Sequence, residues 1–490
     1  MVGRALATAM TALAVGAFGL VACSSDDGGG TSDGSDATAA VAVDATVEGP
    51  VTGGNEDSPP NQVPGNILEK AGYVEDEYFV SGDATSYRSV GELTSDGFWT
   101  VREVDPAPFT TRVMVRHPEN PDDFNGTVIV EWFNVTGGVD FDPDFGMGYP
   151  AVLDEGYAYV AVSAQKVSVD GAGAPALELP GAPPEELLRP LTERDPERYG
   201  DLSHPGDDYS YDIVTQAGQL ARNGEFTDGA PVDNVILVGE SQSAGRIATY
   251  VNAVQPVAEA YDGFLVHSRS ASSAPLVGDA VPPPVVLIRT DLEVPVFQFE
   301  TETDVARGFL SARQPNTDRI MTWEVAGAAH ADDSLTDYGV RSTKTGYDLE
   351  TLCGAVNTGP QQEVLRAAIS ALGEWVVDGT APPATPRIET SGDEMVRDEL
   401  GIVVGGARTP PVDAPKELLT GVNDNSSTVC SLFGSTIPFT AEQLAALYPT
   451  HTDYVDAVTE AADAAVDAGV LRQAEGDAYI TEAEAARVPE

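Results

Sequence analysis

The chain has 490 residues, of which 78 are Asp or Glu and 26 are Lys or Arg, so its formal net charge is -52. A surface of this charge repels phosphate groups, which argues against nucleic acid as a partner and against direct adsorption to anionic lipid. Hydrophobic residues make up 42% of the chain, which is enough for a large core. We therefore assign the acidic residues to a solvated surface; attraction of a cationic substrate is the alternative interpretation.

The first 45 residues have the composition of an export signal and a tether. A basic residue, Arg4, precedes an apolar run that ends in Leu-Val-Ala-Cys at Cys23, and a polar stretch follows at once. This ending resembles the bacterial lipobox, which implies cleavage before Cys23 and lipidation of its sulfur. A membrane-spanning helix is the alternative, but the run is barely long enough. We expect a signal peptide over residues 1–22 and a flexible lipid-anchored tether over residues 23–45, which places the protein at the outer face of the bacterial cell membrane.

From residue 46 onward, short runs rich in β-branched residues alternate with helical patterns. A helix is predicted by the spacing of apolar residues over 213–221. Strands are predicted over residues 111–116, 127–133, 158–163, 235–238, 263–267, 296–299 and 322–325. Such alternation predicts an α/β fold with a mostly parallel central sheet and helices on both faces, whose sites lie at the carboxyl ends of the strands.

We interpret residues 46–490 as a single domain with a C-terminal extension from about residue 378. In this extension, Thr440 and Gln443 form the sequence pattern of a capping box, which predicts a helix that ends before Pro449. A second helix, rich in Ala and Asp, follows. The sequence does not indicate whether the extension caps the site or packs behind the sheet.

The predicted strand over 235–238 leads directly into a candidate nucleophile. Gly239 ends the strand, Ser241 follows two residues later, and small residues then lead into a helical pattern. A sharp strand-to-helix turn would hold the Ser241 hydroxyl clear of the sheet and aim the amide of Gln242 at a developing oxyanion. In the usual G-x-S-x-G pattern a second glycine stands where this chain has Ser243, which makes Ser243 an alternative nucleophile.

An acid and a histidine follow Ser241 in the chain order of a hydrolytic triad. The strand over 296–299 ends in acidic residues, among which we favour Asp304 over Glu302 as the triad acid. The strand over 322–325 leads through small residues to His330, the predicted general base. His267, which ends a strand on the same edge, is the alternative base.

Two other histidines and two loops remain as candidates for a role in the site or in metal binding. His117 and His204 are interpreted as surface residues. The loop after the strand at 127–133 is expected to supply the second oxyanion amide, from Val135 or Asn134. The acidic loop at residues 140–146 misses the EF-hand spacing and is interpreted as a solvated loop rather than a calcium site, so no metal is expected.

The chain has three cysteines, and Cys23 is assigned to the anchor. In an oxidising compartment the other two, Cys353 and Cys430, favour a disulfide over free thiols. Neither lies in a CxxC pattern, so a zinc site is not expected.

Taken together, these motifs resemble a known superfamily. The Gly239–Gly245 turn, with Asp304 and His330, resembles the α/β-hydrolases. Three further motifs, at residues 124–127, 131–135 and 430–434, resemble a bacterial exported branch known only as "alpha/beta hydrolase domain" proteins. The resemblance implies a serine hydrolase that acts on small-molecule esters or related acyl compounds.

The favoured hypothesis is an extracytoplasmic carboxylic ester hydrolase that uses Ser241, His330 and Asp304, forms an acyl-enzyme and needs no cofactor. The same fold also supports amide or carbon-carbon bond hydrolysis. A non-catalytic exported binding lipoprotein on this fold is the alternative from a different class, because a fold does not by itself imply a function.

Overall fold

The computed structural model describes residues 43, 45–55, 59–171, 189–278, 281–343, 353–423 and 427–489. The predicted signal peptide over residues 1–22, the predicted lipidation site Cys23 and nearly all of the predicted tether lie outside the described residues. Residues 40–490 form one compact unit.

The main sheet of the described part has nine strands in the order β1-β2-β3-β5-β4-β6-β7-β8-β9. Neighbouring strands are antiparallel from β1 to β5 and parallel from β5 through β4 to β9. The strands are Thr46–Glu48 (β1), Tyr73–Ser89 (β2), Val101–Pro118 (β3), Thr127–Trp132 (β4), Ala158–Val162 (β5), Asn234–Glu240 (β6), Gly263–His267 (β7), Val296–Thr301 (β8) and Ile320–Val325 (β9). The predicted mostly parallel sheet is confirmed.

Side chains of the central strands pack alternately into two hydrophobic cores. Val128 and Val130 of β4 belong to one core, and Ile129 between them belongs to the other. Ile236 and Val238 of β6 lie in the same core as Ile129. Because successive side chains of a strand point to opposite faces, each face of the sheet carries an apolar layer that a helical layer must cover.

Two pairs of helices contribute to that cover, one pair to each core. The first core takes residues from α6 (Ser210–Arg222), which is the predicted helix, and from α7 (Gln242–Thr249). The second takes residues from α2 (Pro143–Asp154) and α12 (Gln361–Asp378). The expectation of helices on both faces is therefore confirmed.

The other described helices that precede the extension have four or five residues, except for one of 11 residues. They are α1 (Ile67–Ala71), α3 (Lys166–Val169), α4 (Leu191–Arg194), α5 (Pro196–Tyr199), α8 (Gln255–Ala258), α9 (Glu302–Ala306) and α10 (Asp333–Thr343). Single turns of other types are η1 (Pro121–Asp123), η3 (Asp207–Tyr209), η4 (Tyr250–Val254), η5 (Phe309–Ala312) and η6 (Cys430–Leu432). Among the described helices, none combines the length and the apolar character that crossing a membrane requires.

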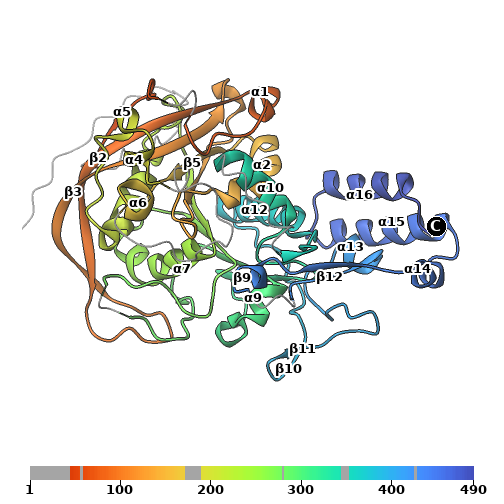
Figure 1. Cartoon of the computed structure of the whole chain (residues 1–490). Helices are drawn as coiled ribbons and strands as arrows, with labels where there is room; N and C mark the ends of the chain where they lie inside the picture. The colour runs from red at the N-terminus through yellow and green to blue at the C-terminus, as the bar shows by residue number, and fades with distance from the viewer. Residues whose placement is uncertain are drawn as a thin grey trace, which may run out of the picture. The chain divides into compact units, whose positions relative to one another are not determined.

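Strands β2 and β3 form a long antiparallel pair, drawn in orange in Figure 1, of which the sequence predicted only a short part of β3. The pairing runs from Tyr73 opposite Pro118 to Ser89 opposite Val101. β5 pairs with β3 only over residues 113–116, so most of β3 has a single neighbouring strand. Proline is tolerated at such an edge, where it interrupts the apolar alternation that identifies a strand.

The described part of the C-terminal extension contains two small antiparallel two-stranded sheets and a group of helices (Figure 1). Its elements are β10 (Thr390–Ser391), β11 (Glu394–Met395), α13 (Pro410–Asp413), β12 (Glu417–Thr420), β13 (Ser435–Pro438), α14 (Ala441–Leu447), α15 (His451–Asp467) and α16 (Gln473–Ala485). The predicted capping box is present, because Thr440 and Gln443 exchange side-chain to main-chain hydrogen bonds at the start of α14. The Ala- and Asp-rich helix predicted after it is α15.

The extension joins the main sheet beside β9. The amide of Ala326 donates to the carbonyl oxygen of Ala407 (3.0 Å), and the amide of Ala407 donates to that of Glu324 (2.7 Å). Further along, the amide of Ala331 donates to the carbonyl oxygen of Leu432 (3.0 Å). The extension therefore reaches the loop that follows β9, which carries His330.

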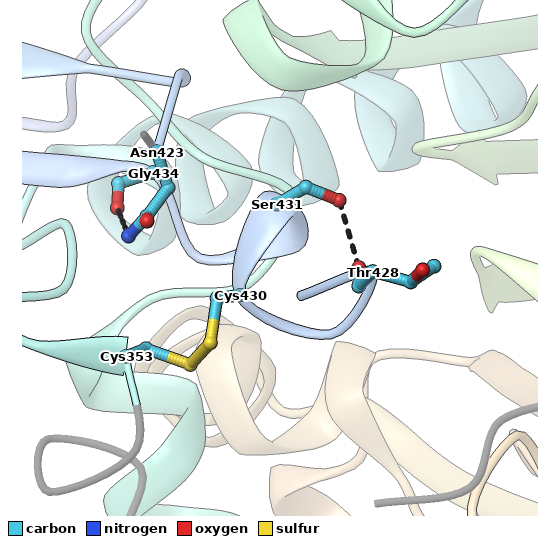
Figure 2. Close-up of a disulfide and its surroundings, with 6 residues drawn as sticks. All are labelled: Cys353, Asn423, Thr428, Cys430, Ser431 and Gly434. Atoms are coloured by element: carbon cyan, nitrogen blue, oxygen red, sulfur yellow. Dashed lines mark hydrogen bonds between the residues drawn. A yellow bond between two sulfur atoms is a disulfide. The ribbon is translucent and has the colours of Figure 1, made fainter. Parts of the chain in front are cut away.

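A disulfide between Cys353 and Cys430 anchors this part of the extension (Figure 2). The two residues are 77 positions apart in the sequence, and their Cα atoms are 5.2 Å apart. Figure 2 also shows the hydroxyl of Ser431 donating to the carbonyl oxygen of Thr428 (2.7 Å), which closes the turn next to Cys430. The bridge thus ties the segment before α12 to the segment that contacts the His330 loop.

Candidate active site

The turn between β6 and α7 places Ser241 at its apex. Ser241 has φ 57° and ψ -110°, a strained conformation that a non-glycine residue rarely adopts. The turn is also tight, since a Cβ atom on Gly239 would lie 2.9 Å from Ile247 and 3.0 Å from Ser243. The amide of Ser241 donates to the carbonyl oxygen of His267 (2.8 Å), which fixes the turn against β7.

His330 lies between Ser241 and Asp304. Its Nε2 atom is 2.8 Å from Oγ of Ser241, and its Nδ1 atom is 2.6 Å from Oδ1 of Asp304. Ser241 follows β6, Asp304 lies in α9 just after β8, and His330 follows β9. Parallel strands end at the same edge of a sheet, which explains how residues far apart in the sequence meet there.

Charges at the candidate site shift the pKa values of His330 and Asp304. Burial alone would raise the pKa of the Asp304 carboxyl, but the charge of His330 and hydrogen bonds from His330 and Thr301 lower it. Burial alone would lower the pKa of His330, but Asp304 and then Glu240 outweigh this effect and raise it to about 9. Asp304 is therefore ionised wherever His330 titrates.

The two alternative candidates for nucleophile and acid make other contacts. Ser243 is buried, and its hydroxyl donates to the carbonyl oxygen of Phe133 (3.1 Å). The carboxylate of Glu302 pairs with Arg397 (2.5 Å) and accepts a hydrogen bond from Thr420 (2.8 Å). The geometry therefore favours Ser241 over Ser243 and Asp304 over Glu302.

His267, the alternative base, is buried beside the site. Its Nδ1 atom is 2.8 Å from Oδ1 of Asp144, and its Nε2 atom is 3.0 Å from Nε2 of Gln361. Both ring nitrogens thus have protein partners other than Ser241, and the carbonyl oxygen of His267 supports the turn at Ser241. His267 is a structural neighbour of the candidate base.

The interpretation of His117 and His204 as surface residues is wrong. Their exposed fractions are 6% and 1%, respectively. Nδ1 of His117 lies 2.9 Å from the carbonyl oxygen of Pro118, and Nε2 of His204 lies 3.0 Å from that of Ala164. Contacts with the main chain hold both rings, as is usual for buried polar groups.

The candidate oxyanion amides lie on the two predicted segments. Gln242 is the first residue of α7, where an amide has no acceptor within the helix. The amide of Asn134 donates to the carbonyl oxygen of Phe141 (2.8 Å) and is therefore engaged. Among the described residues, no acceptor is found for the amide of Val135. Val135 is accordingly the better candidate of the two.

The acidic loop is not solvated, so that interpretation is wrong as well. Asp140, Asp142 and Asp144 are all buried. Asp140 pairs with Arg112 (3.0 Å) and Asp142 with Arg116 (2.7 Å), and both arginines are buried on β3. A buried guanidinium requires a counter-charge, which these aspartates supply. Within the described residues, no group of three or more His, Cys, Asp or Glu side chains is arranged to hold a metal ion.

Sequence reasoning missed one residue that contacts the site, Glu240. Its Oε1 atom lies 3.2 Å from Nε2 of His330, and its Oε2 atom accepts a hydrogen bond from Nδ2 of Asn134 (2.8 Å). The available signal was an acidic residue directly before Ser241, at the end of an otherwise apolar strand.

A mostly parallel sheet covered by helices on both faces, with a strained serine at a strand-to-helix turn on its carboxyl edge, defines a protein of the α/β-hydrolase class. The chain belongs to the family described as alpha/beta hydrolase domain, whose family model matches residues 47–481. The resemblance inferred from the motifs is therefore confirmed.

Solved structures to which the chain is similar include several esterases. The esterase Est22 is 13% identical, with a TM-score of 0.30, over 64% of this chain and 83% of its own. One of two fungal esterases from Rhizomucor miehei is 11% identical, with a TM-score of 0.29, over 61% of this chain and 85% of its own. The carboxylesterase Cest-2923 from Lactobacillus plantarum is 11% identical, with a TM-score of 0.25, over 46% of this chain and 75% of its own. No curated protein sequence matched the chain.

Proposed function

We propose that this α/β-hydrolase is a serine hydrolase of carboxylic esters, with Ser241 as nucleophile, His330 as general base and Asp304 as the acid that orients it. The observation that carries the proposal is the position of the His330 ring. Its Nε2 atom lies 2.8 Å from the Ser241 hydroxyl oxygen, and its Nδ1 atom lies 2.6 Å from the Asp304 carboxylate. These distances match the requirement that base and nucleophile lie within hydrogen-bond reach while a third group fixes the tautomer of the base.

In the first half of the proposed reaction, Oγ of Ser241 attacks the ester carbonyl and its proton passes to Nε2 of His330. The amides of Gln242 and Val135 donate to the oxyanion of the tetrahedral intermediate. When the intermediate collapses, the carbon-oxygen bond to the alcohol breaks, and His330 returns the proton to that leaving alcohol. The acyl group stays on Ser241 as an ester.

In the second half, water attacks the acyl-enzyme and gives one proton to His330. Collapse of the second tetrahedral intermediate releases the carboxylic acid, and the proton on His330 restores the Ser241 hydroxyl. Asp304 stays ionised throughout and stabilises the imidazolium in both halves. No cofactor takes part in these steps.

The proposal includes an extracytoplasmic location. The lipobox-like ending at Cys23 supports a lipid anchor, residues 23–45 would be a tether, and residues 46–490 would carry the catalysis. The Cys353–Cys430 disulfide is consistent with an oxidising compartment. Contact with the membrane would then be through the anchor only, since the net charge of -52 disfavours adsorption to anionic lipid.

An active-serine phosphonate probe tests the chemistry. The wild-type protein should be labelled at Ser241, whereas Ser241→Ala should not be labelled and Ser243→Ala should be labelled normally. An ester panel of increasing acyl chain length should then identify the substrates. Absence of both labelling and ester hydrolysis in a folded protein would favour a non-catalytic binding lipoprotein instead.

The anchor needs its own test, by mass spectrometry of the mature N-terminus in wild-type and Cys23→Ser proteins. A lipidated Cys23 at the new N-terminus is expected in the wild type. An unmodified Cys23 or cleavage at another position would exclude the proposed anchor without affecting the catalytic proposal.

A further inference from the structure

The imidazole of His330 faces two carboxylates rather than one. Asp304 lies at Nδ1, as described above, and Oε1 of Glu240 lies 3.2 Å from Nε2. The same Nε2 atom is 2.8 Å from the hydroxyl oxygen of Ser241. The nitrogen that must accept the serine proton therefore stands beside a second negative charge, which the general Ser-His-Asp arrangement does not require.

The carboxylate of Glu240 is held rigidly in this position. Nδ2 of Asn134 donates to Oε2 of Glu240 (2.8 Å) and to its main-chain oxygen (3.1 Å). Asn134 is fixed in turn, because its Oδ1 atom accepts the amide of Thr136 (2.8 Å). Glu240 is only 4% exposed. Its charge therefore acts on His330 through protein rather than through water, so it is weakly screened.

Other charged groups also act on this pair from the neighbouring elements. They are Asp304 of α9, Arg307 directly after that helix, His267 of β7 and Asp144 of α2. Asp332, two residues after His330, is turned to other partners, since its Oδ1 atom accepts hydrogen bonds from Ser334 and from the amide of Leu335. Among these groups, Asp304 and Glu240 are the carboxylates that contact the His330 ring.

The electrostatics follow from these positions. Burial raises the pKa of Glu240 to about 7, although the charges of His330 and His267 oppose that shift. The pKa of His330 is raised to about 9, because Asp304 and Glu240 outweigh the effect of burial. Between these values, Glu240 is a carboxylate and His330 is an imidazolium, which cannot accept a proton from Ser241.

We propose that Glu240 is a positioning residue for His330, which binds the imidazolium at Nε2 and so sets the acidic limit of activity. The inference rests on the proposed serine hydrolase function. The carboxylate has opposite effects on the two sides of this limit. At lower pH it stabilises the resting imidazolium and suppresses activity; at higher pH it stabilises the imidazolium that forms when Ser241 attacks.

The substitution Glu240→Gln removes the charge and keeps the shape and an acceptor for Asn134. The acidic limb of the pH profile of kcat/KM should move to lower pH by about one unit or more. The alkaline plateau should fall by about three- to tenfold, because a weaker base takes the serine proton less readily. Glu240→Asp keeps the charge but moves it away from His330 by the length of one methylene group. This variant should shift the acidic limb in the same direction by a smaller amount. It replaces Glu240→Gln in the test if Glu240→Gln does not fold.

Glu363→Gln is the matched control. Burial raises the pKa of Glu363 to about 7 as well, but its charged partner is Arg366 of α12 rather than a residue of the site. This variant should leave the acidic limb where it is in the wild type. If Glu363→Gln and Glu240→Gln shift the limb equally, the effect is general and the proposal is wrong.

A direct titration of His330 separates this proposal from the function on which it rests. The ring pKa can be followed by ¹⁵N NMR in Ser241→Ala and in Ser241→Ala with Glu240→Gln, neither of which needs to turn over substrate. A lower His330 pKa in the second protein supports the role of Glu240 even if no ester is hydrolysed by the wild type. An unchanged pKa, together with activity lost evenly at every pH, would show that Glu240 is only structural.

Discussion

Thr301 holds the carboxylate of Asp304 in the orientation that reaches His330. The amide and the hydroxyl of Thr301 both donate to Oδ2 of Asp304, at 2.8 and 2.6 Å. The hydroxyl oxygen of Thr301 in turn accepts the amide of Asp304, which completes a capping box at the start of α9. One helix cap thus positions the acid of the proposed triad and leaves its Oδ1 atom for His330.

Thr301→Ala should therefore affect both stability and catalysis. We expect a loss of about 1 kcal/mol in the free energy of unfolding from the missing cap, and a kcat about 10- to 100-fold lower because Asp304 is less well placed. Thr450→Ala is the matched control, since Thr450 and Asp453 form the same capping box on α15. It should lose similar stability and keep its activity. Full kcat in Thr301→Ala would contradict this role.

Ser241→Ala should lower kcat by about 10⁴- to 10⁶-fold, because only binding and the oxyanion amides would remain. His330→Ala should cause a similar loss, since the two residues act as a unit. Ser243→Ala should cost about 1 kcal/mol of stability through the lost hydrogen bond to Phe133 and should leave kcat close to the wild type. Near-full esterase activity in folded Ser241→Ala would exclude Ser241 as the nucleophile.

Asp304 and Glu302 should respond differently to loss of charge. Asp304→Asn should lower kcat by about 10²- to 10⁴-fold, because an amide neither fixes the tautomer of His330 nor stabilises its cation. Glu302→Gln should keep its activity but lose about 1.5 to 3 kcal/mol of stability, since its buried carboxylate pairs with Arg397. Steady-state kinetics and urea unfolding distinguish the two; a reversed pattern would transfer the acid role to Glu302.

The pH dependence of the wild type should be that of an alkaline enzyme. The pKa of His330 is raised to about 9. Below that pH the imidazolium predominates, so kcat/KM should fall by about tenfold per pH unit as the pH decreases. The measurement is a profile with an uncharged ester, whose own ionisation cannot contribute. An acidic limb centred near pH 6 to 7 would show that the carboxylates do not act on His330 as described.

Loss of the disulfide should lower both stability and activity. Replacing Cys353 and Cys430 by Ser opens a link between residues 77 positions apart and should cost about 2 to 5 kcal/mol. The extension would then hold the His330 loop less firmly, because Leu432 accepts the amide of Ala331. Thiol titration of the unreduced, denatured wild type should find neither cysteine free, and two reactive thiols there would exclude the bridge.

Much of the fold was predictable because its signals are local. The run of apolar residues before Gly239 predicted β6, and the helical spacing after it predicted α7. The capping box at Thr440 predicted the start of α14 because it too is a local signal: its hydrogen bonds join residues only three positions apart. By contrast, most of the β2–β3 pair was not predicted, because its strands are interrupted by polar residues and prolines and are stabilised by pairing with each other.

The sequence by itself determined the α/β alternation, the turn at Ser241 and the chain order of serine, acid and histidine, because each depends on neighbouring residues or on the ends of strands. Tertiary structure decided which carboxylate meets which partner. It directed Asp304 to His330 and Glu302 to Arg397, buried Asp142 against Arg116, and brought Glu240 to the second nitrogen of the imidazole. These pairings join residues on different segments of the chain, and a charge is buried only where the fold supplies its counter-charge, which no local pattern specifies.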